Sequence, residues 1–133
     1  MNIIPYCKQN VTKTDKKIVN QSLSEKLITT GKFVKQFENK TKKFLKPNYT
    51  LCCSSGTAAI HMALMSINLK ENECVIMPAI NFIASYNLCL TLKSKIYLAD
   101  VDSITGQMKP ENVLDCIKKN NIKKIKLIIT MYL

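Results

Sequence analysis

The sequence contains no arginine: all 20 of its cationic side chains are lysines, against nine acidic residues, for a formal net charge of +11. Arginine is the residue that usually recognises phosphate groups and guanine through paired hydrogen bonds. Its absence argues against a nucleic-acid partner. We therefore expect the lysine clusters to be solvated protein faces.

Long apolar runs are also missing. No stretch approaches the roughly 18 consecutive apolar residues that a membrane-spanning helix needs, and the N-terminus lacks the basic-then-apolar order of a secretory signal. The hydrophobic fraction of 47% and the charged fraction of 22% are those of a globular protein. These features predict a cytoplasmic protein with no membrane partner.

Metal-binding patterns are absent as well. The single histidine, His61, has no partner at ligand spacing, and none of the six cysteines forms a C-x-x-C pair. Most of the cysteines sit in apolar runs, where a free thiol behaves as a small hydrophobic side chain. We predict no metal site, and buried structural thiols in a reducing compartment.

Helical and strand patterns alternate along most of the chain. This alternation predicts an α/β fold with a mainly parallel sheet and flanking helices. We expect a helical segment over residues 1–48 and an α/β domain over residues 49–133. The expected helices follow Thr12 or Thr14, follow Gly31, and cover residues 57–67, 82–92 and 110–119; the expected strands cover residues 49–53, 74–77, 95–99 and 126–130.

Helical spacing also suggests which side chains form the core. Phe33, Phe37 and Phe44 recur on one side of the second helix. Ala58 and Met62 recur with Met65 on one side of the third helix. We expect both sets to be buried.

The strongest local motif covers residues 54–59, where a strand is expected to turn into a helix. Gly56 permits a tight turn and a close approach to a ligand. The first amides of the helix lack intrahelical acceptors, the helix dipole favours an anion there, and Ser55 and Thr57 add hydroxyl donors. The motif fits a phosphate group. Taken by itself, the motif is explained better by a simple Ser/Thr N-cap with a permissive glycine.

The motif is one of six segments, in matching order and spacing, that resemble the DegT/DnrJ/EryC1/StrS aminotransferase family. The resemblance covers essentially all 133 residues. Its segments are residues 4–9, 27–32, 37–38, 54–61, 78–84 and 100–102. It implies that this chain is the N-terminal part of the large domain of a fold-type I pyridoxal-phosphate enzyme.

The resemblance implies cofactor-binding roles. Ser55, Gly56, Thr57 and Ala58 would hold the phosphate of pyridoxal 5'-phosphate, mostly through backbone N–H groups. Phe82 occupies the family's position for an aromatic ring stacked on the pyridine. From the residues alone, a core phenylalanine in a strand-to-helix turn explains Phe82 equally well.

Four residues near the N-terminus are implicated in substrate binding by the same resemblance. Tyr6, Thr29, Thr30 and Gly31 lie in segments that the family uses around a nucleotide sugar. For residues 29–31 the competing interpretation is a turn between two helices with capping hydroxyls.

Within the family, the opening segment and residues 27–32 look most like the branch of pseudaminic acid biosynthesis. This likeness implies amino transfer from glutamate to C4 of a UDP-linked 4-keto-6-deoxy-sugar, by a homodimer. A sugar dehydratase of the same family, or a non-catalytic α/β module that binds a phosphate ligand, are the alternatives.

The residues that carry the chemistry in family members lie beyond position 133. They are a Schiff-base lysine, which dehydratases replace with histidine, and an acid that pairs with the pyridine nitrogen. None of the lysines present matches that position, so we assign no catalytic residue and expect an inactive fragment. Asp100 and Asp102 lie two residues apart, but we interpret them as turn-forming acids rather than an acid/base pair, and His61 as structural.

Overall fold

The computed structural model describes residues 7–132 and divides into two compact units, with the boundary between Cys52 and Cys53. We call the described residues before this boundary unit 1 and those after it unit 2. The expected division after residue 48 into a helical segment and a separate α/β domain stays a prediction.

Unit 1 consists of two helices whose ends are set by local capping. Helix α1 (Lys13–Leu23) begins with a capping box, in which the Thr12 hydroxyl accepts from the Asp15 amide and the Asp15 carboxylate accepts from the Thr12 amide. Helix α2 (Lys32–Leu45) begins after Gly31 and ends at Lys46, which is left-handed with φ 56°. Both helices were predicted.

No residue of α1 or α2 is buried. Phe37 and Phe44 are 60% and 84% exposed. The prediction that this side of the second helix is buried is therefore wrong. Two helices alone present too little apolar surface to enclose side chains of this size.

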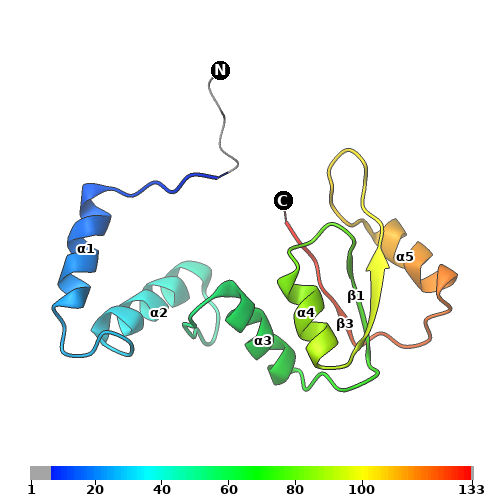
Figure 1. Ribbon diagram of the computed structural model, residues 1–133, viewed down its shortest axis with the longest axis horizontal. Helices are drawn as coiled ribbons and strands as arrows, with labels where there is room; N and C mark the ends of the chain where they lie inside the picture. Colours follow the sequence, from blue (N-terminus) through cyan, green and yellow to red (C-terminus); the bar gives the residue numbers. More distant parts are fainter. Residues whose placement is uncertain (1–6, 133) are drawn as a thin grey trace. The chain divides into compact units, whose positions relative to one another are not determined.

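Unit 2 is built around a parallel sheet (Figure 1). Its strands are β1 (Cys74–Pro78), β2 (Lys95–Ala99) and β3 (Leu127–Ile128), in the order β2-β1-β3. Its helices are α3 (Gly56–Ser66), α4 (Ala84–Thr91) and α5 (Pro110–Lys119). The predicted α/β class, with a mainly parallel sheet and flanking helices, is confirmed.

The central strand β1 presents apolar side chains to both faces of the sheet, and helices cover both faces. Its five residues are all buried, as expected for a parallel strand that is packed on both sides. Val75 and Met77 point to one face, in a cluster with Cys89 of α4; Leu64 of α3 lies in the same cluster. Cys74 and Ile76 point to the other face and pack with Ala99 and with Cys116 of α5.

Two further expectations from the sequence are wrong. Residues 49–53 do not form a strand: Tyr49 and Leu51 are 87% and 74% exposed, and the described sheet does not include them. A strand requires a partner, which the local sequence cannot supply. In α3 the buried residue is Leu64, while Met62 and Met65 are exposed, because this helix is apolar nearly all round and its spacing does not select a face.

Candidate functional site

The N-terminus of α3 carries two backbone donors without acceptors. The Ser55 hydroxyl caps the helix by accepting from the Ala58 amide at 3.1 Å, and the Ser55 carbonyl accepts from the Ala59 amide at 3.0 Å. Among the described residues, nothing accepts from the amides of Gly56 and Thr57. The N-cap is therefore present, and two amides remain available to an anion.

Gly56 is not needed by the fold itself. Its backbone is helical rather than left-handed, so the predicted tight turn does not depend on glycine. A Cβ atom added there would meet no atom within 4 Å. The space beside the α-carbon of Gly56 is therefore open. In addition, the first turn of α3 contains no acidic side chain that would repel an anion.

Topology directs this helix end toward the carboxyl ends of the strands. Helix α3 leads through a short connection into the start of β1 and packs on the same face of the sheet as α4. A helix joined in this way runs antiparallel to the following strand. Its N-terminus consequently points toward the carboxyl side of the sheet, where ligands gather in folds of this kind.

A topological switch point lies at the same side of the sheet. The chain leaves β1 for α4 on one face and leaves β2 for α5 on the other (Figure 1). Connections from neighbouring strands to opposite faces create a crevice beyond the strand ends. A cavity of about 270 Å³ lies there, lined by Met77, Pro78, Ala79, Asn81, Phe82, Ile83, Tyr86 and Leu98.

Phe82 belongs to this cavity and not to the core. Its side chain is 70% exposed and is absent from both hydrophobic clusters. The position therefore leaves an aromatic face free, as a stacking role requires. Whether a pyridine ring stacks on it stays a prediction.

The same cavity contains a residue that the sequence did not single out. Of the eight lining residues, only Asn81 and Tyr86 carry polar side-chain atoms. The Nδ2 atom of Asn81 is shielded from solvent and has no hydrogen-bond partner among the described residues. A lone asparagine after a strand is an ordinary turn residue, so only the three-dimensional structure could identify it.

The residues predicted to bind substrate belong to unit 1, except that Tyr6 lies outside the described residues. Thr29 and Thr30 are exposed and cap neither helix. Gly31 is the N-cap of α2, and a Cβ atom there would lie 2.0 Å from the Leu27 carbonyl oxygen. The helix-to-helix turn is therefore observed, with glycine rather than capping hydroxyls at its critical position. The substrate-binding roles stay predictions.

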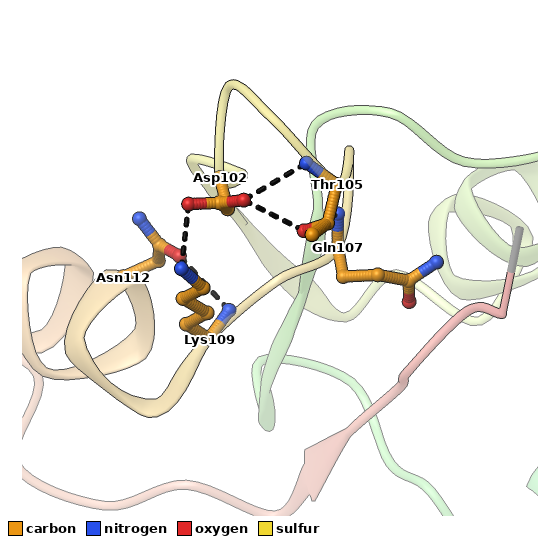
Figure 2. Close-up of polar contacts among 5 residues, drawn as sticks. All are labelled: Asp102, Thr105, Gln107, Lys109 and Asn112. Atoms are coloured by element: carbon orange, nitrogen blue, oxygen red, sulfur yellow. Dashed lines mark hydrogen bonds and ion pairs between the residues drawn. The ribbon is translucent and has the colours of Figure 1, made fainter.

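Asp102 is held in a closed turn, as Figure 2 shows. Its carboxylate accepts from the Thr105 amide at 2.9 Å and the Thr105 hydroxyl at 2.8 Å, and it pairs with the Lys109 ammonium at 2.6 Å. The hydrogen bonds from Lys109 and Thr105 hold the pKa of Asp102 well below its usual range. Gly106, with φ 67°, completes the turn.

This geometry supports a structural role for both acids. Asp102 is fully engaged within its own loop. Within residues 7–132, the carboxylate of Asp100 accepts only from the neighbouring Val101 amide. The interpretation as turn-forming residues therefore agrees with the structure.

The thiols are less uniformly buried than expected. Cys74, Cys89 and Cys116 are buried, whereas Cys7 and Cys52 are exposed and Cys53 is intermediate. Burial raises the pKa of the Cys74 and Cys89 thiols, which makes them poor nucleophiles. All six are free. Among residues 7–132, no group of three or more histidine, cysteine or acidic side chains lies close enough to hold a metal ion.

No helix within the described part of the chain is long and apolar enough to cross a membrane.

Comparison with known proteins gives a consistent result. The pattern that defines the DegT/DnrJ/EryC1/StrS aminotransferase family matches residues 9–132. A GDP-perosamine synthase from Escherichia coli O157:H7 is 31% identical over 114 residues, which cover 85% of this chain and 31% of that protein. The chain thus spans about a third of the length of the curated relatives that it matches.

Solved structures share the fold. An aminotransferase from Psychrobacter cryohalolentis matches with a TM-score of 0.78 at 24% identity, over 97% of this chain and 32% of that one. A GDP-4-keto-6-deoxymannose-3-dehydratase with a trapped PLP-glutamate geminal diamine matches with a TM-score of 0.80 at 22% identity, over 95% and 33%.

Proposed function

This chain belongs to the DegT/DnrJ/EryC1/StrS aminotransferase family, and from that premise we propose that its protein is a nucleotide-sugar aminotransferase. Glutamate is the proposed amino donor. The proposed acceptor is C4 of a UDP-linked 4-keto-6-deoxy-sugar, as in the pseudaminic acid branch of the family. A homodimer and a cytoplasmic location belong to the same proposal; six free thiols fit a reducing compartment.

Pyridoxal phosphate is the cofactor, as predicted, and the described residues fit it. The single observation that carries the proposal is the pair of backbone amides at the N-terminus of α3, those of Gly56 and Thr57, which have no acceptor among the described residues. They would bind the cofactor phosphate with help from the helix dipole. The Ser55 hydroxyl, whose oxygen already accepts from Ala58, keeps its own proton free to donate.

When bound, pyridoxal phosphate would supply the amino-transfer chemistry. The role of this chain is to hold and orient the ring. Phe82, 70% exposed at the cavity of the switch point, offers a flat apolar surface for this purpose. The cavity wall is otherwise largely apolar, which favours exclusion of water from the ring.

We also propose which residues contact the substrate. Tyr6, Thr29, Thr30 and Gly31 are assigned to the nucleotide sugar on family likeness alone. The relative named above is a GDP-perosamine synthase, so the choice between UDP and GDP is the part most in need of a test. A dehydratase is the second candidate, favoured by the matching fold of the GDP-4-keto-6-deoxymannose-3-dehydratase.

The test uses the whole protein that the gene encodes, supplied with pyridoxal phosphate, glutamate and either a UDP-linked or a GDP-linked 4-keto-6-deoxy-sugar. We expect mass spectrometry to detect the 4-amino sugar, formed faster from the UDP-linked substrate. Preference for GDP would overturn the UDP assignment. Loss of the C3 hydroxyl without amino transfer would identify a dehydratase, and cofactor binding without turnover a non-catalytic module.

Substitutions at Phe82 and Leu90 make this test specific to the site. Phe82→Ala removes the stacking face and should weaken pyridoxal phosphate binding about tenfold, the loss expected for one aromatic stacking contact. Phe82→Tyr should preserve it. Leu90→Ala is the matched control, because Leu90 is an exposed apolar residue on α4 that does not line this cavity.

A further inference from the structure

We propose that a lysine-lined cavity at the amino ends of the strands binds a small polyanion, a ligand that carries two or more negative charges close together. The cavity belongs to unit 2 and has a volume of about 300 Å³. Its lysines are Lys95, Lys123, Lys124 and Lys126. This inference goes beyond the proposed function and does not depend on it, because the candidate cofactor site lies at the carboxyl side of the sheet.

The parallel sheet brings the beginnings of its strands together. Strand β1 begins at Cys74, which pairs in register with Lys95, the first residue of β2. The Lys126 amide donates to the Cys74 carbonyl at 2.9 Å, which holds the residues before β3 beside the start of β1. Lysines from two distant segments of the chain, residues 95 and 123–126, therefore meet at this edge of the sheet.

The cavity lies on the face of the sheet that α5 covers. Lys95 and Tyr97 are two residues apart on β2, so their side chains leave the strand on the same face. Tyr97 packs against the cluster that contains Cys116 of α5, and Ile122, in the loop after α5, packs against the same cluster. The cavity is thus bounded by β2 and by this loop, with lysines on both sides.

Positive charge in this cavity is largely unbalanced. Glu73 is its only acidic lining residue, and that carboxylate already accepts a backbone hydrogen bond and pairs with Lys126 at 3.8 Å. The other three lysines of the cavity make no ion pair among the described residues. Like charges that line one cavity repel one another, and a bound anion relieves this repulsion.

The size and the charge of the cavity indicate the class of ligand. A volume of about 300 Å³ is at the lower end of the range for small-molecule sites. Lysine binds phosphate and carboxylate groups as a point charge, so the cavity should select the number of charges rather than a planar shape. An anion inside it would feel all four lysines, since salt screens exposed charges strongly only beyond about 8 Å at physiological ionic strength.

The experiment measures binding of inorganic diphosphate and of citrate to the whole protein by calorimetry. Saturating pyridoxamine phosphate is present, so that the proposed phosphate site at the start of α3 is already occupied. Lys95→Gln and Lys123→Gln each remove one charge from the cavity, and Lys95→Arg keeps the charge. Lys118→Gln is the matched control, because Lys118 is an exposed lysine on α5 that does not line the cavity and makes no ion pair among the described residues.

We expect each of the two cavity substitutions to glutamine to raise the Kd for diphosphate about three- to tenfold, the loss typical of one contact with an exposed charge. Lys95→Arg and Lys118→Gln should stay within about twofold of the parent. Added potassium chloride should weaken binding, and less steeply in the two glutamine variants of the cavity. Binding of pyridoxamine phosphate should be unchanged in all variants.

Other results would overturn the inference. An equal loss in Lys118→Gln would show that the net charge of the chain attracts the anion, and not this cavity. A parent protein that binds neither anion would refute the site, as would cavity variants that bind both anions as the parent does. Lysine-dependent binding of only one of the two anions would support the site and identify phosphate or carboxylate as the group that it takes.

This test also separates the inference from the proposed function. Failure of the parent protein to bind pyridoxamine phosphate would count against the proposed cofactor site. The polyanion site would still stand on the difference between the cavity variants and Lys118→Gln.

Discussion

Unit 1 and unit 2 obtain their structure from different sources. In unit 2 the central strand β1 is buried along its whole length, and two hydrophobic clusters cover the two faces of the sheet. In unit 1 neither helix has a buried residue. The ends of α1 and α2 are instead defined by the Thr12 capping box, by Gly31 and by the left-handed Lys46.

This difference shows that capping residues and burial patterns act over different distances along the sequence. Caps act over three or four residues and specify where a helix begins, whatever surrounds it. Burial depends on partners far away in the sequence and specifies which face of an element is covered. Unit 1 follows mainly the first kind of signal, and unit 2 the second. Three substitutions test this contrast, in order of expected effect.

The largest effect is expected from Ile76→Ala in β1. Ile76 is 0% exposed and packs in the cluster with Cys74, Ala99 and Cys116. Its truncation should lower the free energy of unfolding by about 2–5 kcal/mol. Phe44→Ala in α2 should change it by less than about 0.5 kcal/mol, because Phe44 is 84% exposed. Urea denaturation measures both.

An equal loss from the two substitutions would break the comparison. It would mean that the apolar side of α2 is covered in the protein, so that unit 1 is stabilised by burial after all. An intermediate loss from Phe44→Ala with an unchanged m-value would indicate partial cover.

The second effect is expected from Gly31→Ala, at the turn before α2. The backbone of Gly31 is in an ordinary region, with φ −80°, so alanine is excluded by contact and not by conformation. Its Cβ would lie 2.0 Å from the Leu27 carbonyl oxygen and 3.2 Å from the carbonyl carbon. Relieving this overlap requires a backbone shift costing about 1–3 kcal/mol. Hydrogen exchange at residues 25–36 should increase.

Gly56→Ala is the matched control. Its Cβ would meet nothing within 4 Å, and alanine is favoured over glycine in a helix by about 0.5–1 kcal/mol. The two glycines should therefore respond with opposite signs. A destabilised Gly56→Ala variant would contradict the view that the fold itself does not need this glycine.

The same contrast explains what the sequence could predict about the fold. Strand β2 and helix α5 occur at their predicted residues. Helix α1 follows Thr12, one of its two predicted caps, and α2 follows the predicted Gly31, because caps, proline and short apolar runs are local signals. The buried face of α3 was mispredicted, since the helix is apolar on nearly every side. Residues 49–53 were mispredicted as a strand for the related reason that pairing is not local.

Some features of the candidate site could likewise be predicted from local sequence, and others depend on the three-dimensional fold. The capped N-terminus of α3 was predictable, because Ser55 and Gly56 lie within one short motif. The cavity at the switch point was not, since it depends on the connections of β1 and β2 leaving to opposite faces. Phe82 was identified only through family likeness. Asn81 was not singled out, because only the packed structure shows that its Nδ2 atom lacks a hydrogen-bond partner among the described residues.

The smallest effect is expected from Asp102→Asn. This substitution tests a locally stabilised turn within unit 2, where burial is the main source of stability. The Asp102 carboxylate accepts from Thr105 and pairs with Lys109, so the folded state lowers the pKa of Asp102 below that of the unfolded chain. The ionised form therefore stabilises the fold at pH values above the unfolded pKa of about 3.9. This contribution is lost as the pH falls below that value toward the lower folded pKa.

The parent protein should accordingly melt a few degrees above Asp102→Asn at pH 7, the range expected for a local polar contact. The difference should persist down to about pH 5 and shrink below about pH 4. Asp115→Asn is the matched control, because Asp115 is exposed on α5 and makes no hydrogen bond or ion pair among the described residues. If the difference between the parent and Asp102→Asn stayed constant from pH 7 to pH 3, the ionised carboxylate would not be its source. The Lys109 contact would then be incidental, and unit 2 would owe its stability to burial alone.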